Sequence, residues 1–131
     1  MRFFTKEWYQ ANQGPNCCGD DSTWTRYELH LKEQEIPETL RTFSAHDSLI
    51  KRCEWVGDEL HLRFDTIGAL SDLERAVFHN ATLSCECAKL IDSYWLYEEI
   101  ERCDEGWKLC ALLSRRDTLL EIEIRFSEME G

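Results

Sequence analysis

The stretch that decides the fold runs from Ile91 to Phe126 and contains SYWLYEEI (93–100), WKLCALL (107–113) and LEIEIRF (120–126). In the last segment apolar and polar residues alternate strictly, which is typical of a half-buried strand because successive side chains point to opposite faces of a sheet. Residues 94–97 are apolar at every position, which predicts a strand in the interior of the sheet, whereas Glu121 and Glu123 leave one face of the last strand in water. Three consecutive antiparallel strands are therefore expected here.

The preceding segments extend this sheet. Residues 49–55 and 59–65 flank Val56-Gly57-Asp58, and Leu60, Leu62 and Phe64 alternate with polar residues in the second of them. This pattern predicts a β-hairpin with a glycine-dependent turn. A further strand is expected within residues 76–85, which brings the sheet to about six strands.

The N-terminal part is predicted to be helical. Thr5 is a suitable N-cap for a helix over residues 6–13, and Ser22 or Thr23 can cap a second helix that ends before Pro37. Pro37 can itself open a third helix as its first residue. The predicted fold class is α+β, with two or three N-terminal helices packed on an antiparallel sheet that is strongly twisted or barrel-like. We expect residues 1–131 to form a single domain, helical over about 1–45 and β-rich over about 46–131.

Composition and charge restrict the function. The formal net charge is −11, from 26 acidic and 15 basic residues, so nucleic acid and anionic membranes are unfavourable partners. The first residues, MRFFTKE, lack the apolar run of a secretory signal, and no stretch approaches the twenty apolar residues of a membrane span. We expect a soluble protein of the cytoplasm. Seven cysteines, an odd number, fit free thiols there better than a disulfide framework.

Several of these segments together resemble a known family. They are FFTKEWY (3–9), His46-Asp47, FHNA (78–81) and WLYEEI (95–100). The chain is similar at these positions to a family of small bacterial proteins, found mainly in Firmicutes, that is classed as a domain of unknown function. The resemblance implies a bacterial cytosolic protein. It implies no activity, cofactor or catalytic residue, because the family has none established.

His46-Asp47 is the strongest candidate for catalysis. A His-Asp dipeptide can ligate a metal or form a general base with its orienting carboxylate. This reading defines one hypothesis, a small hydrolase or metal-dependent enzyme centred on His46 and Asp47. Phosphohydrolases that use such a dipeptide build it into helices with further ligands, whereas here it precedes a run of strands. The simpler interpretation is that Asp47 binds backbone groups where a strand begins.

The cysteines offer a second candidate. Cys85 and Cys87 would share one face of a strand, and with Cys17 and Cys18 they could supply four zinc ligands. Structural zinc sites usually have two to four residues between paired cysteines, whereas Cys17-Cys18 has none and Cys85-Glu86-Cys87 has one, so we expect no metal. No other cofactor motif is present: the chain has no Gly-x-Ser-x-Gly, no Cys-x-x-Cys and no phosphate-binding glycine loop.

The tryptophans allow two interpretations. Trp8, Trp24, Trp55, Trp95 and Trp107 could line a ligand pocket. Because they are spread over five different elements, we expect them instead to meet in one core.

An acidic surface is the remaining candidate. Glu99, Glu101, Glu121 and Glu123 could align on neighbouring strands and form a surface for a basic partner protein. Solvation of one sheet face explains the same residues, as it does for Glu98-Glu99. The leading hypothesis is thus a non-enzymatic binding or protein-interaction module, for which an inhibitor- or immunity-like role towards a basic partner is one form. The alternative is the enzyme centred on His46 and Asp47. The sequence leaves the oligomeric state open.

Overall fold

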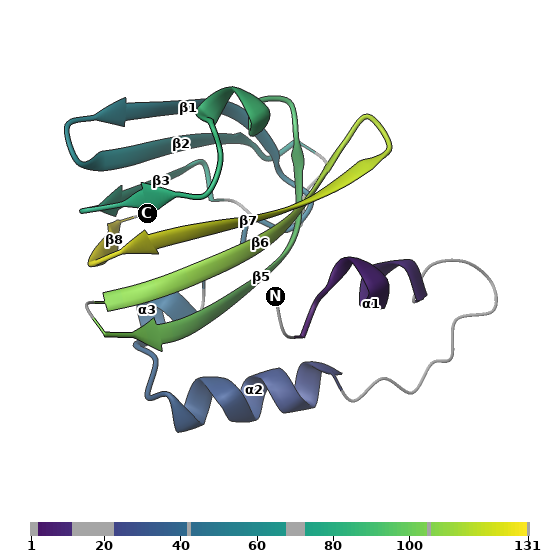
Figure 1. The fold of residues 1–131 in the computed structure, drawn as a ribbon, viewed down its shortest axis with the longest axis vertical. Coiled ribbons are helices and arrows are strands. Elements are labelled where there is room, and N and C mark those ends of the chain that lie inside the picture. The colour runs from purple at the N-terminus through teal and green to yellow at the C-terminus, as the bar shows by residue number, and fades with distance from the viewer. Residues whose placement is uncertain (1–2, 12–22, 42, 68–72, 105, 131) are drawn as a thin grey trace.

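A computed structural model describes residues 3–11, 23–41, 43–67, 73–104 and 106–130 (Figure 1). Its helices are α1 (Lys6–Ala11), α2 (Thr23–Glu33), the single turn α3 (Glu38–Arg41) and the 3₁₀ turn η1 (Cys87–Lys89). Its strands are β1 (Leu49–Val56), β2 (Glu59–Asp65), β3 (Arg75–His79), β4 (Thr82–Leu83), β5 (Tyr94–Cys103), β6 (Gly106–Arg115), β7 (Thr118–Phe126) and β8 (Glu128–Glu130).

Helix boundaries follow from local chemistry. Thr5 caps α1 as expected, since its Oγ1 accepts the backbone N–H of Trp8 at 3.0 Å. Helix α2 ends four residues before Pro37, and Glu35 then takes a left-handed φ of 51°. The carbonyl of Pro37 accepts the N–H of Arg41 at 2.9 Å, which closes the single turn of α3. Among the described residues, only α1 and α2 are longer than about one turn. The helical part is therefore at the lower end of the predicted two or three helices.

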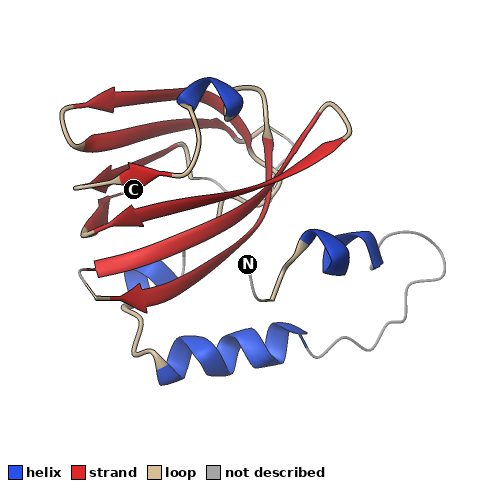
Figure 2. Cartoon of the chain, in the orientation of Figure 1, coloured by secondary structure: helices blue, strands red, loops and turns tan. Residues whose placement is uncertain are grey.

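All strands join one antiparallel sheet in the order β4-β7-β6-β5-β1-β2-β3-β8. Figure 2 shows α1, α2 and α3 gathered on one side of this curled sheet, away from η1. The α+β class and the antiparallel sheet are as predicted. The end strands β4 and β8 are not paired with each other, so the sheet is curled but not closed into a barrel.

The sheet has eight strands and not about six, because two long strands are interrupted. Asn80, with a left-handed φ of 52°, separates β3 from β4, and Ser127 separates β7 from β8. The two interruptions meet: the N–H of Ser127 donates to the carbonyl of His79 at 2.9 Å, and Asn80 Nδ2 donates to Ser127 Oγ at 2.9 Å. On either side of them β3 pairs with β8 and β4 pairs with β7.

Strand β5 has a free edge over most of its length. It pairs with β6 throughout, but with β1 only at Leu49 opposite Tyr94. Helix α2 covers the rest of this edge with polar side chains: Tyr27 Oη accepts the N–H of Ile100 at 2.8 Å, and His30 Nε2 lies 3.1 Å from the Ile100 carbonyl. The prediction of an interior strand is confirmed by the strand order, in which β5 lies between β6 and β1. Its pairing with β1 is confined to one end, however, and α2 rather than a strand shields the rest of that edge from water.

The tryptophans do not meet in one core. Trp95 is fully buried in the main core, with its ring centroid 5.6 Å from Phe43 and 5.8 Å from Phe64. Trp8 and Trp24 belong to a second aromatic cluster around Phe4, whereas Trp55 is 44% exposed. Two hydrophobic centres thus form on either side of β5.

Among the helices of the described residues, none is long and apolar enough to cross a lipid bilayer.

Candidate functional site

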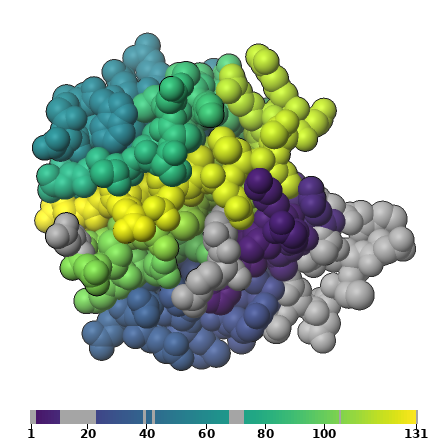
Figure 3. Space-filling model, in the orientation of Figure 1, coloured from purple at the N-terminus to yellow at the C-terminus, as the bar shows by residue number. Residues whose placement is uncertain are grey.

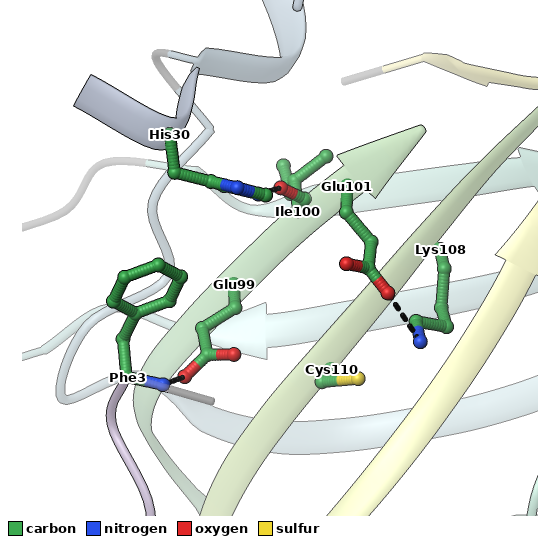
Figure 4. Close-up of a pocket in the computed structure, with 7 residues that line it drawn as sticks. All are labelled: Phe3, His30, Glu99, Ile100, Glu101, Lys108 and Cys110. Atoms are coloured by element: carbon green, nitrogen blue, oxygen red, sulfur yellow. Dashed lines mark hydrogen bonds and ion pairs between the residues drawn. The ribbon is translucent and has the colours of Figure 1, made fainter. Parts of the chain in front are cut away.

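Glu99 lies inside the protein and does not belong to an acidic surface. Only 8% of the residue is exposed, and its Oε1 accepts the backbone N–H groups of Phe3 and Phe4 at 2.6 and 2.5 Å. It borders a small cavity of about 50 Å³ between the N-terminal segment, α2 and the β5–β6 hairpin, shown in Figure 4. Glu99 therefore anchors the N-terminal segment, which corrects its assignment to an interaction surface.

The other three carboxylates of the proposed surface are placed differently. Glu101 pairs with Lys108 on the adjacent strand, and this contact raises the pKa of the Lys108 ammonium (Figure 4). Glu123 accepts a hydrogen bond from Arg125 Nε at 2.9 Å and lies 4.0 Å from Lys108 Nζ. Glu121 is exposed, opposite Leu112 in the register. Cations interleave with the acids, so the four residues do not form one unpaired acidic row.

His46 and Asp47 are held by the backbone of β5. His46 Nδ1 donates to the carbonyl of Leu96, the residue that bulges between Trp95 and Tyr97, while the N–H of Asp47 donates to the Trp95 carbonyl at 2.7 Å. His46 Nε2 lies 3.4 Å from Asp47 Oδ2. His46 Nδ1 and the backbone N–H of Asp47 thus satisfy two carbonyl groups of β5 where the strand is irregular.

The predicted thiol arrangement is wrong in its local structure. Strand β4 ends at Leu83, so Cys85 and Cys87 do not share a strand, and Cys87 begins the turn η1. Cys17 and Cys18 lie outside the described residues. Within those residues, no group of three or more His, Cys, Asp or Glu side chains is arranged to hold a metal ion.

A larger pocket of about 380 Å³ opens beside the bulge of β5. It lies between α2, α3, the segment that leads to His46, and β5. Aromatic rings of Trp24, Tyr27, Phe43 and Tyr97 form much of its wall. Figure 3 shows the blue atoms of α2, several of whose residues line this pocket, next to the green atoms of the β5–β6 hairpin.

Four acidic or basic side chains also line this pocket: Glu28, Arg41, His46 and Glu98. Glu28 and Arg41 are exposed, and they extend from α2 and α3. His46 is fixed by Leu96, as described above. Glu98 is the remaining polar group, and it comes from the central strand itself.

Glu98 has an unusual environment for a carboxyl group. Burial raises its pKa to about 7, and hydrogen bonds from Trp95 Nε1 and from its own backbone N–H oppose that rise. The indole N–H of Trp95 donates to Glu98 Oε2 at 3.1 Å. No cationic side chain contributes to this pKa, and in the described part of the chain no Lys or Arg forms an ion pair with Glu98.

Sequence reasoning missed Glu98, because it grouped Glu98 with Glu99 as solvated acids. As neighbours in a strand, Glu98 and Glu99 lie on opposite faces of β5, and the bulge at Leu96 determines which face each one takes. Neither side chain is fully solvated. The sequence contains one relevant signal. Residues 94–97 show no apolar/polar alternation, so the pattern does not determine which of Glu98 and Glu99 faces each side of the sheet.

Comparison with known proteins identifies a family but no better-known relative. No curated protein and no solved structure matches the chain. Residues 19–122, from before α2 to within β7, match the family described as Protein of unknown function (DUF4085). This match covers most of the chain, and the chain therefore belongs to the DUF4085 family, whose function is unknown.

Proposed function

We propose that this protein is a non-enzymatic binding module of the bacterial cytosol that takes a basic side chain of a partner protein into the pocket beside β5. The proposal rests on the environment of Glu98. This carboxyl group lies at the wall of an aromatic-lined pocket, and no cationic side chain of the described residues pairs with it. The basic partner expected from the net charge of −11 then has a defined point of attachment.

The physical argument starts from the cost of an isolated buried charge. Burial makes ionisation of Glu98 unfavourable, as its pKa of about 7 shows. An incoming ammonium group would offset this cost, because an opposite charge within a few ångströms favours the ionised form. The faces of Trp24, Tyr27 and Tyr97 also attract a cation through their π-systems.

The size and rim of the pocket favour a side chain over a larger ligand. A volume of about 380 Å³ is near the lower limit for small-molecule pockets. Trp24, at 49% exposure, and Leu29, at 53%, are exposed large hydrophobic residues on the same helix that lines the pocket. Exposed tryptophan beside a desolvated pocket is typical of protein interfaces. The acidic net charge would speed encounter with a basic partner.

The alternative, a small hydrolase or metal-dependent enzyme at His46 and Asp47, has less support. His46 does line the pocket, and a carboxyl pKa near 7 is the value a general base would have. However, His46 Nδ1 is held by the Leu96 carbonyl, and Asp47 is tied to β5 through its own backbone N–H. Among the described residues, no group of three or more His, Cys, Asp or Glu side chains is arranged around this pair to hold a metal ion.

An NMR titration tests the proposal. The probe is Nα-acetyl-lysine methylamide, which carries the basic side chain alone, and the matched neutral probe is the norleucine analogue. The Trp95 indole N–H reports on the site, since it is hydrogen-bonded to Glu98. The lysine probe should shift this resonance in the wild type with saturation, and the norleucine probe should not.

Two variants complete the experiment. Glu98→Gln keeps the shape of the side chain but removes its charge, so binding of the lysine probe should fall by at least tenfold, whereas Glu28→Gln, on the exposed rim, should lose less than threefold. Equal binding of the two probes, or an unchanged affinity in Glu98→Gln, would refute the proposed function.

A further inference from the structure

A group of thiols lies at a distance from the pocket. Cys53 on β1 is buried, and Cys87, the first residue of η1, is half-buried. Their Sγ atoms are 2.8 Å apart, with Cys53 as the donor and Cys87 as the acceptor of a thiol hydrogen bond. A disulfide has an S–S distance of about 2.05 Å, so the two sulfurs already face each other at less than one ångström beyond that length.

The backbone on both sides of this pair is fixed. Turn η1 is closed by the N–H of Leu90, which donates to the Cys87 carbonyl at 3.0 Å. The segment after it is tied to β1, because the N–H of Asp92 donates to the Ile50 carbonyl and the N–H of Ile50 donates to the Ser93 carbonyl, each at 2.9 Å. The two cysteines are therefore held in register by hydrogen bonds that involve neither side chain.

We propose that Cys53 and Cys87 form a disulfide site that is oxidised by a low-molecular-weight disulfide, such as oxidised glutathione. In the first step the Cys87 thiolate attacks one sulfur of the small disulfide, which forms a mixed disulfide on Cys87 and releases one thiolate. In the second step the Cys53 sulfur attacks Cys87 Sγ, which forms the protein disulfide and releases the second thiolate. The two protons lost by the protein thiols are taken up by the two released thiolates.

The order of attack follows from exposure and from the hydrogen bond. Cys87 is the more exposed thiol, so the small disulfide reaches it first. Burial raises the pKa of the Cys53 thiol, which makes Cys53 a poor nucleophile towards molecules in solution. Its attack on the neighbouring Cys87 is intramolecular, and proximity compensates for that low reactivity.

Cys85 is the competing partner within this group. Cys85 is half-buried, and in its thiolate form it would add to the rise in the pKa of Cys53. Burial also raises the pKa of the Cys85 thiol, although Lys89 opposes the rise. The described structure shows no hydrogen bond between Cys85 and either of the other two thiols, so the Cys53–Cys87 pair is the one whose geometry favours a bond.

The bond would close a loop whose ends are 34 positions apart and would tie η1 to β1. Cross-links that close long loops restrict the unfolded chain, so oxidation should raise the unfolding temperature. Neither cysteine lines the pocket, so the disulfide can form whether or not the pocket binds a cation.

Peptide mapping of the full chain tests this inference. Reduced wild-type protein is treated with oxidised glutathione, alkylated and digested without reductant. The map should contain a Cys53–Cys87 linked peptide, and the oxidised protein should unfold several degrees above the reduced one. Absence of that peptide, or linkage of Cys85 to Cys53 or to Cys87 in its place, would overturn the inference.

Three variants separate the two steps. Cys53→Ser should stop at the mixed disulfide and accumulate glutathione on Cys87, and Cys87→Ser should leave Cys53 unmodified. Cys110→Ser, on the distant strand β6, is the matched control and should retain the linked peptide. Glutathione on Cys53 in the Cys87→Ser protein would contradict the order of attack and the shielding of Cys53.

Discussion

Replacing Glu98 with Gln should stabilise the protein above pH 7 and have little effect below about pH 4.5. The folded protein holds a proton on Glu98 up to a pKa of about 7, whereas the unfolded chain releases it near the ordinary value of 4.5. Between these two values the folded state binds more protons, so its stability decreases as the pH rises. Above pH 7 the folded state bears the full cost of the buried charge.

The size of this effect follows from the two pKa values. Each pKa unit corresponds to about 1.4 kcal/mol, so a rise from 4.5 to about 7 gives an upper bound of roughly 3 kcal/mol. Gln keeps the oxygen that accepts the Trp95 indole N–H and carries no charge. The difference in the free energy of unfolding between Glu98→Gln and the wild type should therefore grow from less than about 1 kcal/mol at pH 5 to at most about 3 kcal/mol at pH 8.

Urea unfolding, followed by tryptophan fluorescence in the presence of a thiol reductant, measures this difference across pH 4.5–8. Taking the difference between variant and wild type at each pH removes the contribution of all other titrating groups. Glu28→Gln is the control, and as an exposed substitution it should stay within about 0.5 kcal/mol of the wild type throughout. A Glu98→Gln difference that does not change with pH would refute the assignment of Glu98 as a half-buried carboxyl with a raised pKa.

Three further substitutions test the fold, each by urea unfolding at pH 7.5. Glu99→Ala should lower the free energy of unfolding by about 2–3 kcal/mol, because two backbone N–H groups lose their acceptor. The control Glu121→Ala, on the surface, should lower it by less than about 0.5 kcal/mol, and equal losses would contradict the buried role of Glu99. Tyr27→Phe should cost about 1–3 kcal/mol by leaving the Ile100 N–H unbonded at the free edge of β5, and an unchanged stability would show that water replaces the hydroxyl there. Gly106→Ala should lower the free energy of unfolding by about 2 kcal/mol or more, since φ is 150° and a Cβ would overlap the backbone carbonyl of Phe126. An unchanged stability would show that the turn relaxes freely.

The hairpins could be predicted because their signals are local. Gly57, with φ of 62°, makes the turn between β1 and β2 where the glycine was expected. The alternation of residues 120–126 likewise corresponds to β7, with Ile122, Ile124 and Phe126 buried. Period and turn chemistry depend only on neighbouring residues, so a single sequence contains both.

The strand count could not be predicted because it depends on where long strands break. Asn80 is a residue type that tolerates the left-handed conformation, but its isolated presence within residues 76–85 did not distinguish a break from a surface position. The break is stabilised by Ser127, 47 residues later in the chain. Only the folded structure brings these two interruptions together.

The site could not be predicted for a similar reason. The bulge at Leu96 determines which of Glu98 and Glu99 faces each side of β5, and nothing in residues 94–97 marks which residue bulges. The pocket then requires α2 to lie along the free edge of β5. That arrangement depends on Tyr27 and His30 reaching the backbone of Ile100, a contact between residues about seventy positions apart.

The pH dependence of binding of the lysine probe tests the central claim most directly. The probe's ammonium stays charged below pH 9, so any change in affinity reports on the protein. If the cation binds ionised Glu98, the apparent affinity follows the ionised fraction, and with a pKa of about 7 it should rise roughly thirtyfold from pH 5.5 to pH 8. Glu98→Gln should bind weakly at both values. An affinity that stays constant or falls over this range in the wild type, or an equal rise in Glu98→Gln, would contradict the account.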